Sequence, residues 1–83
     1  MGKPDFVLVK FGRNLRKFRD AAGLTQETLA ERADMDRTYL SDIERGLRNA
    51  GIKNIVRLAN ALGIPPARLM DGVGAANRNS TKT

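Results

Sequence analysis

The chain of 83 residues contains no cysteine and no histidine, and its aromatic residues are limited to three phenylalanines and one tyrosine. Without cysteine, neither a disulfide nor a thiolate metal site can stabilise the fold. Without histidine, the chain lacks the commonest metal ligand and the usual general base near neutral pH. Glycine-rich phosphate loops and nucleophile motifs are missing as well. We therefore expect no metal, no cofactor and no enzymatic activity.

Long hydrophobic runs are also missing, because no apolar run approaches the roughly 18 residues that cross a membrane. The apolar residues 6–9 near the start are not followed by a cleavage-site pattern. We expect a cytoplasmic protein with no membrane partner and no small-molecule ligand. A chain this short forms one domain and buries only about 60% of its unfolded surface, so a second subunit would add stability.

Basic residues outnumber acidic ones, with 15 Lys and Arg against nine Asp and Glu and a net charge of +6. Such an excess favours a polyanionic partner, and nucleic acid is the first candidate. The excess lies at the two ends, since residues 1–24 carry six basic and two acidic side chains and residues 50–83 carry five and one. Residues 25–49 carry four basic and six acidic side chains. If this middle segment meets DNA, it must do so through particular side chains, while the flanks attract phosphate.

Apolar residues recur with the period of an α-helix in the first third of the chain. Phe11, Leu15, Phe18 and Ala22 follow one another at steps of four, three and four. This spacing places them on one face of an amphipathic helix. Gly23 suits the left-handed position that ends such a helix.

Four further helical segments follow, and no segment has the pattern of a strand. They begin at a capping residue or a proline, and glycine ends most of them. The segments are 25–33, 36–46, 53–63 and 65–70, with Leu29, Ala30, Ala33, Leu40, Ile43, Ile55, Leu58, Ala59, Leu62, Leu69 and Met70 expected to face the core. Residues 72–83 are small, polar and without periodicity, so a disordered tail is expected after a domain at residues 1–71. The predicted fold class is all-α with five helices.

The second and third of the five helical segments are separated by a turn of only about three residues at Asp34 and Met35, which favours a steep crossing of the two helices. This is the helix-turn-helix arrangement. It supports one helix from behind and exposes its front, so that side chains can enter the major groove of DNA.

The stretch GLTQETLAERADMDRTYLSDIERGLRN, residues 23–49, resembles the Cro and phage-repressor class of helix-turn-helix proteins, the XRE family. The resemblance rests on LTQ-x-x-LA followed by a helix ending in IE-x-G, and FG-x-x-LR before it and RLANALGIP after it extend it. The string DRTYLSDIERGLRN is similar to the controller proteins of restriction–modification systems. The resemblance implies a phage-repressor-like five-helix domain that binds double-stranded DNA and regulates transcription.

The resemblance further implies that residues 36–45 form the recognition helix, with side chains presented to DNA at Arg37, Thr38, Tyr39, Ser41 and Asp42. Arg37 can bind a guanine edge with two hydrogen bonds, and Thr38 can contact a thymine methyl. Tyr39 has an alternative role in packing on the preceding helix. Because Asp42 cannot approach a phosphate favourably, it is expected to accept from a cytosine amino group or to restrain a neighbouring arginine.

Further DNA contacts are implied at the end of this helix or outside it, at Gln26, Arg45, Arg48, Asn49 and Lys53. Gln26 follows the expected cap Thr25, where a helix N-terminus favours a phosphate, although it could instead only orient its helix. The other four residues are expected to contact the DNA backbone or groove. Arg19 and Glu44 match a partly buried ion pair of the family, and we expect them to serve the fold, since a buried charge must be paired.

Most helix-turn-helix regulators of this size bind palindromic DNA as two-fold dimers. The resemblance places the homodimer interface on the last helices, near Ile52, Ile55, Val56, Ile64, Leu69 and Met70, with core packing as the alternative for each. The leading hypothesis is a nucleoid-associated transcriptional repressor or activator that acts as a dimer, with a possible role in controlling a restriction–modification operon. The second hypothesis is an antitoxin-type interaction module that autoregulates its own operon.

Overall fold

The computed structural model describes residues 3–74, which contain five α-helices and no strand. The helices are α1 (Phe6–Ala21), α2 (Gln26–Arg32), α3 (Arg37–Glu44), α4 (Ile52–Leu62) and α5 (Pro66–Leu69). The predicted all-α class is confirmed. Residues 75–83 of the expected tail lie outside the described residues, whereas residues 72–74 form a turn in which Val73 packs against the core.

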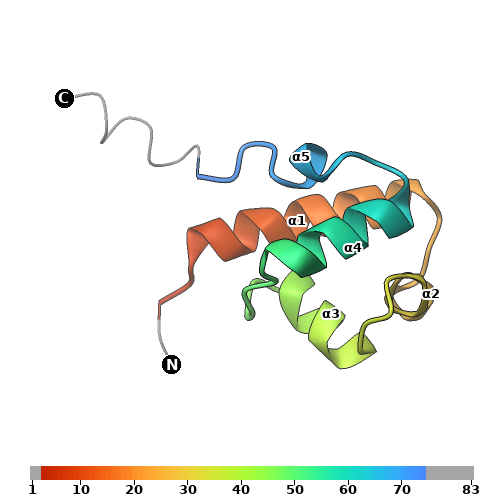
Figure 1. Cartoon of the computed structure of the whole chain (residues 1–83). Helices are drawn as coiled ribbons and strands as arrows, with labels where there is room; N and C mark the ends of the chain where they lie inside the picture. The colour runs from red at the N-terminus through yellow and green to blue at the C-terminus, as the bar shows by residue number, and fades with distance from the viewer. Residues whose placement is uncertain (1–2, 75–83) are drawn as a thin grey trace.

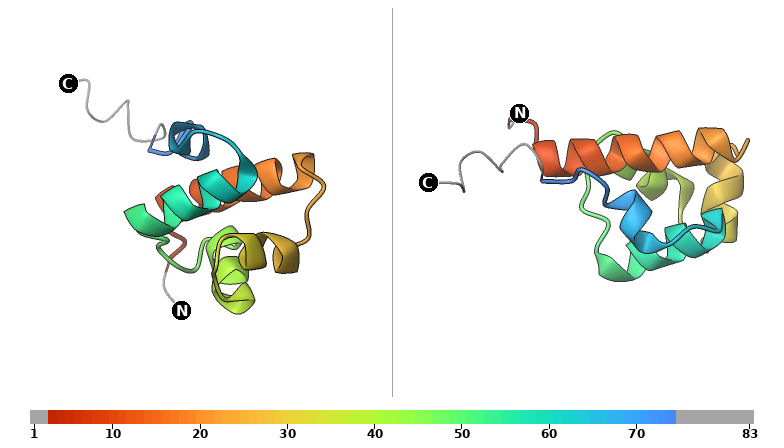
Figure 2. Two further views of the ribbon diagram at one scale, coloured as in Figure 1. Left: turned by 45° about the vertical axis from the view of Figure 1, so that its right-hand side comes forward. Right: turned by 90° about the horizontal axis from the view of Figure 1, so that it is seen from above.

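The helices surround one small core. In Figures 1 and 2, α5 lies on one side of α1 and α4, and the α2–α3 pair lies on the other side. Every helix contributes at least one fully buried side chain, namely Leu15, Leu29, Leu40, Ile43, Leu58 and Leu69. No helix of the described residues is long and apolar enough to cross a membrane.

Helix α1 begins before the apolar stripe from which it was predicted. The Asp5 carboxylate accepts hydrogen bonds from the backbone N–H groups of Val7 at 3.0 Å and Leu8 at 3.2 Å, and so caps the helix at Phe6. At the other end, Ala22 was expected on the buried face but is exposed. The expectation was wrong because the helix ends at Ala21 and Ala22 is its C-cap, so the stripe stops one turn earlier.

The caps predicted for the next two helices are confirmed. The Thr25 hydroxyl accepts from the Thr28 N–H, and the Asp36 carboxylate accepts from the Tyr39 N–H, both at 3.0 Å. Gly23 has a φ of +73°, the left-handed conformation expected after α1. In the last helix, Leu69 and Met70 were both expected to face the core. Leu69 is fully buried as expected, but Met70 is 43% exposed as the C-cap of α5.

Two contacts of α1 position the rest of the molecule. A Cβ at the buried Gly12 would lie 2.5 Å from the carbonyl oxygens of Ile43 and Glu44, so the backbones of α1 and α3 meet directly at this point. Two residues further on, the buried Asn14 donates both amide hydrogens, to the carbonyl oxygens of Leu69 and Asp71 at 2.8 Å each. Helix α1 thus contacts the end of α3 at Gly12, and it binds the end of α5 and the residues after it through Asn14.

Candidate nucleic-acid interface

Helices α2 and α3 are joined by a short turn at residues 33–36, in which Asp34 adopts a positive φ of +54°. The inner face of α3 carries Leu40 and Ile43, which are fully buried. The N-terminal residues Arg37 and Thr38 are exposed on its outer side. The arrangement therefore leaves a helix supported from behind with free polar side chains in front, as the sequence predicted.

A buried ion pair fixes the C-terminal end of α3 against α1. Arg19 donates from Nε to Glu44 Oε2 at 2.6 Å and from Nη2 to Glu44 Oε1 at 3.0 Å. Its Nη1 donates to the Leu24 carbonyl oxygen at 2.8 Å, and the Glu44 side chain is only 3% exposed. The hydrogen bond to Glu44 raises the pKa of Arg19 above its usual value, although burial acts in the opposite direction. The predicted structural role of this pair is thus confirmed.

Gln26 is part of the same network. It is the first residue of α2, and its side-chain Nε2 donates to Glu44 Oε1 at 3.0 Å. The amide group is half-buried, and its donor is engaged within the protein. Local sequence patterns do not indicate this contact, because Gln26 and Glu44 lie 18 residues apart. The expected phosphate contact of Gln26 stays a prediction. The same side chain also connects α2 to the end of α3 through its hydrogen bond to Glu44.

Tyr39 connects α3 to the loop that follows it. Its hydroxyl donates to the carbonyl oxygens of Asn49 at 3.1 Å and Ala50 at 3.4 Å. The guanidinium of Arg48 lies 5.8 Å from the centre of the Tyr39 ring. Tyr39 therefore positions the loop from Arg45 to Gly51, a role that local sequence spacing did not reveal.

Asp42 lies beside two arginines, which is one of the two roles expected from its charge. Its carboxylate is 3.5 Å from Arg45 Nη1 and 3.8 Å from Arg48 Nε. The side chain of Asp42 is 24% exposed, and those of Arg45 and Arg48 are 65% and 61% exposed. The structure thus brings four of the predicted DNA-contacting residues, including Tyr39, into one cluster.

The other predicted contacts lie around this cluster. Ser41 is half-buried on α3, and Asn49 is exposed with its side-chain Oδ1 accepting from the Gly51 N–H at 3.1 Å. Lys53 is exposed in the first turn of α4 and makes no hydrogen bond or ion pair with other described residues.

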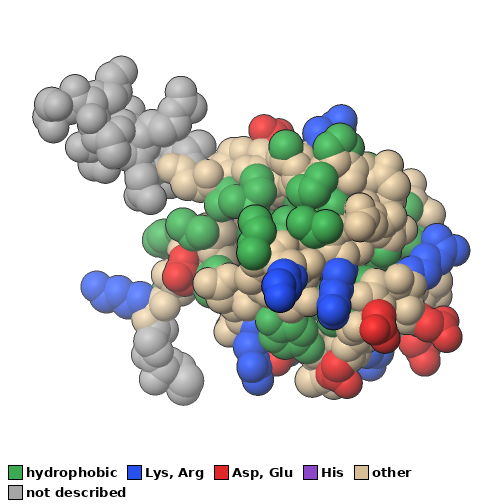
Figure 3. Space-filling model, viewed as in Figure 1, with side chains coloured by type: hydrophobic (Ala, Val, Ile, Leu, Met, Phe, Trp, Pro, Cys, Tyr) green, Lys and Arg blue, Asp and Glu red, His purple; other side chains and the backbone are tan. Residues whose placement is uncertain are grey.

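Exposed apolar side chains gather on a different face, over α4 and α5 (Figure 3). Ile52 is 75% exposed, Met70 43% and Val56 39%, and Val7 of α1 is 41% exposed. Val7 and Met70 also line a small recess together with Ile55. Leu69, for which core packing was the alternative to this interface, is fully buried in the core.

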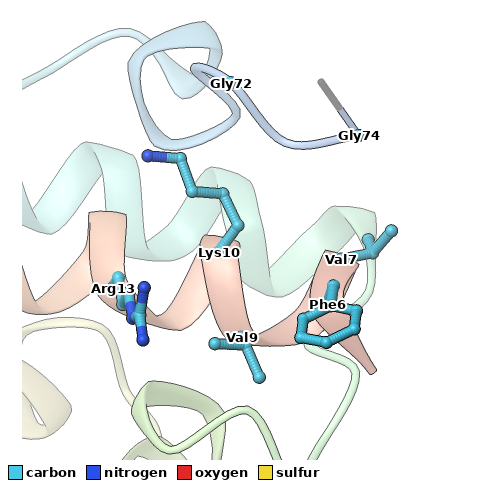
Figure 4. Close-up of a pocket in the computed structure, with 7 residues that line it drawn as sticks. All are labelled: Phe6, Val7, Val9, Lys10, Arg13, Gly72 and Gly74. Carbon is cyan, nitrogen blue, oxygen red and sulfur yellow. The ribbon is translucent and has the colours of Figure 1, made fainter. Parts of the chain in front are cut away.

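A recess of about 250 Å³ lies between the start of α1 and the turn at residues 72–74 (Figure 4). Its lining combines the apolar side chains of Phe6, Val7 and Val9 with the cations Lys10 and Arg13. The Lys10 side chain extends toward Gly72 in this view. Sequence reasoning predicted no site here.

Known proteins are similar to this chain in sequence and in fold. A family model described as helix-turn-helix matches residues 15–69. The control protein C.BamHI of Bacillus amyloliquefaciens is 41% identical over 77 residues, which cover 92% of this chain and 95% of that protein. The control protein C.MunI of Mycoplasma sp. is 37% identical over 68 residues, which cover 81% of this chain and 92% of that protein.

Solved structures agree with the sequence comparison. The restriction–modification controller protein C.AhdI of Aeromonas hydrophila matches with a TM-score of 0.74 and 53% identity, over 75% of this chain and 94% of that one. The controller protein C.Esp1396I, solved as a tetramer in complex with its natural 35 base-pair operator, matches with a TM-score of 0.75 and 35% identity, over 83% of this chain and 91% of that one. This chain is similar in sequence and fold to these controller proteins. It therefore belongs to the helix-turn-helix family of transcriptional regulators.

Proposed function

We propose that this protein is a sequence-specific regulator of transcription that binds double-stranded operator DNA and controls a restriction–modification operon. The observation that carries the proposal is the outer face of α3, where Arg37 and Thr38 are exposed while Leu40 and Ile43 are fixed in the core. The similarity to C.BamHI over 95% of that control protein supports the choice of operon. Such a regulator acts without enzymatic activity, in the cytoplasm on the nucleoid.

The chemistry of α3 suits readout in the major groove. Residues near the N-terminus of a recognition helix contact base edges, and Arg37 and Thr38 occupy the first two positions of α3. An arginine there can donate two hydrogen bonds to the O6 and N7 atoms of guanine. Arg45, Arg48 and Lys53 supply positive charge for phosphates, which positions the protein on the duplex but carries no sequence information.

The apolar face formed by Ile52, Val56 and Met70 supports a homodimer. These side chains are exposed, and Met70 lines a small recess together with Val7 and Ile55. One recognition helix reads only a few base pairs, so two copies related by a two-fold axis fit a palindromic site. The operator complex of the related controller C.Esp1396I contains a tetramer, which is compatible with pairs of dimers on adjacent sites.

Selection of bound duplexes from a random DNA library tests this function. We expect sequencing to return a palindrome with half-sites about one helical turn apart, and footprinting to find that site upstream of genes for a restriction endonuclease and a methyltransferase. Enrichment of no common sequence, with binding that fades uniformly as salt rises, would leave only nonspecific attraction and contradict the proposal. An asymmetric site occupied by one protomer would contradict the dimer alone.

A further inference from the structure

The C-terminal end of α3 places one carboxylate between two guanidinium groups. Asp42 lies 3.5 Å from Arg45 Nη1 and 3.8 Å from Arg48 Nε. Both distances exceed those of good hydrogen bonds, so the arginines are held by charge rather than by fixed donor geometry. Both arginines are also about two-thirds exposed. They can therefore leave the carboxylate when a stronger anion approaches.

Arg48 is held from a second side by Tyr39. Its guanidinium lies 5.8 Å from the centre of the tyrosine ring, a distance at which a cation is attracted to the ring face. The Tyr39 hydroxyl donates to the carbonyl oxygens of Asn49 and Ala50, which fixes the loop that carries Arg48. The arginine is thus restrained by a carboxylate on α3 and by a ring that is itself anchored.

We propose that Asp42 is a positioning residue that sets DNA specificity by holding Arg45 and Arg48 away from the phosphates of nonmatching sequences. This inference rests on the proposed function. On nonmatching DNA, phosphate attraction alone must compete with the Asp42 carboxylate, which also repels phosphates. On a matching site, the base contacts of α3 hold the duplex close, and the arginines can exchange Asp42 for DNA.

The substitution Asp42→Asn tests the proposal, because it keeps the shape of the side chain and removes its charge. We expect binding to a random duplex to strengthen and the slope of log affinity against log salt to steepen by about one. That change makes the gain about fourfold larger at about 50 mM than at about 200 mM salt. Binding to the selected operator changes less, so the ratio of specific to nonspecific affinity falls.

Glu31→Gln is the matched control. Glu31 is an exposed carboxylate of α2 that takes part in none of the ion pairs found among the described residues, and its substitution changes the net charge by the same amount. We expect it to leave the affinity ratio unchanged. The ratio should also respond less to Asp42→Asn in an Arg48→Ala background, because coupled residues are not additive. Equal gains for Asp42→Asn and Glu31→Gln would overturn the proposal, as would full additivity of Asp42→Asn with Arg48→Ala.

Loss of operator binding by Asp42→Asn without any gain on random DNA would also overturn the proposal, since it would indicate that Asp42 reads a base directly. A measurement without DNA separates this inference from the proposed function. In the free protein, the NMR signal of the Arg48 Nε–H group should shift and exchange faster with water in Asp42→Asn but not in Glu31→Gln. An unchanged signal contradicts the restraint, whatever DNA the protein prefers. Failure of the wild type to select any sequence contradicts the proposed function alone.

Discussion

At the scale of single residues, the position of α3 depends on the ion pair between Arg19 and Glu44. The pair is nearly inaccessible to solvent, and its hydrogen bonds satisfy both side chains together with Gln26 and the Leu24 carbonyl group. A buried charge without its partner is much more costly than the pair itself is stabilising. The pair is therefore a point where one substitution can displace α3, the helix that we propose reads DNA.

We expect Glu44→Gln to lower the free energy of unfolding by about 3 kcal/mol at pH 7, because it leaves the Arg19 charge buried without a counterion. Urea denaturation monitored by circular dichroism measures the change. The pKa of Arg19 is raised in the folded state, so its contribution is fully present below the usual arginine pKa and is lost only as the pH rises above that value. Glu31→Gln serves as the control, and an equal effect of the two substitutions would contradict the role of the buried pair.

Arg37→Ala should act on DNA recognition and leave stability unchanged, since Arg37 is exposed and contributes no buried contact. We expect a loss of about 1–3 kcal/mol on the selected operator, with relaxed preference at one base pair of each half-site. Competition binding with a panel of single-base operator variants provides the test. If the variant protein keeps the full preference at every position, Arg37 does not read a base.

At the scale of elements, α1 and α3 are joined by backbone contact rather than by side chains alone. Gly12 is buried against the carbonyl groups of Ile43 and Glu44, at a distance that leaves no space for a methyl group. Both neighbours are backbone atoms at the end of α3, the proposed recognition helix, and backbone cannot move aside as a flexible side chain can. The angle of α3 thus depends on the absence of a side chain at residue 12.

Gly12→Ala should therefore destabilise the protein by about 1–3 kcal/mol through overpacking, in spite of the higher helix propensity of alanine. Thermal unfolding measures the loss, and amide chemical shifts of α3 report its displacement. Arg13→Ala, on the exposed side of the same helix, is the matched control. Stabilisation by Gly12→Ala would show that α1 and α3 do not approach each other as closely as described.

The sequence predicted the elements better than it predicted the contacts between them. Caps such as Thr25 and Asp36 and the apolar spacing of the first four helices are local signals, and they fixed the helices to within a few residues. The start of α1 was missed because residues 6–9 form a continuous apolar run, in which Phe6 and Val7 are exposed while Leu8 and Val9 are half-buried, so the helical period is not visible there. The contacts of Gln26 and Tyr39 were missed because each joins residues at least ten positions apart.

At the scale of the whole molecule, the outer face of α3 that we propose binds DNA and the apolar face over α4 and α5 are different parts of the surface. A domain of this size buries only a small hydrophobic core, which limits its stability as a monomer. A dimer would bury the exposed side chains of Ile52, Val56 and Met70 as well. Folding and association are then linked, because a partner that binds only the folded state stabilises it by mass action.

Ile52→Asp should abolish the dimer, because it places a charge in the middle of the proposed apolar interface. We expect a monomer by sedimentation, a melting temperature that no longer rises with protein concentration, and operator binding weakened at least tenfold, in line with a loss of more than about 1.4 kcal/mol. Leu47→Asp is the control for self-association, since Leu47 is 59% exposed in the loop after α3, outside this patch. A dimer that survives Ile52→Asp would place the interface elsewhere.

Asn14 sets a limit on how this sequence can vary. Its two amide hydrogens are divided between the carbonyl groups of Leu69 and Asp71, which enclose the exposed Met70. Aspartate has the same shape but offers only acceptors, glutamine is longer by a methylene group, and leucine would remove the donor from both the buried Leu69 carbonyl group and the part-buried Asp71 carbonyl group. Arg13 and Arg16 are exposed, so substitutions there leave no buried backbone group without a hydrogen-bond partner. In a library of random substitutions selected for folding, position 14 should therefore tolerate fewer alternatives than the exposed polar positions of α1.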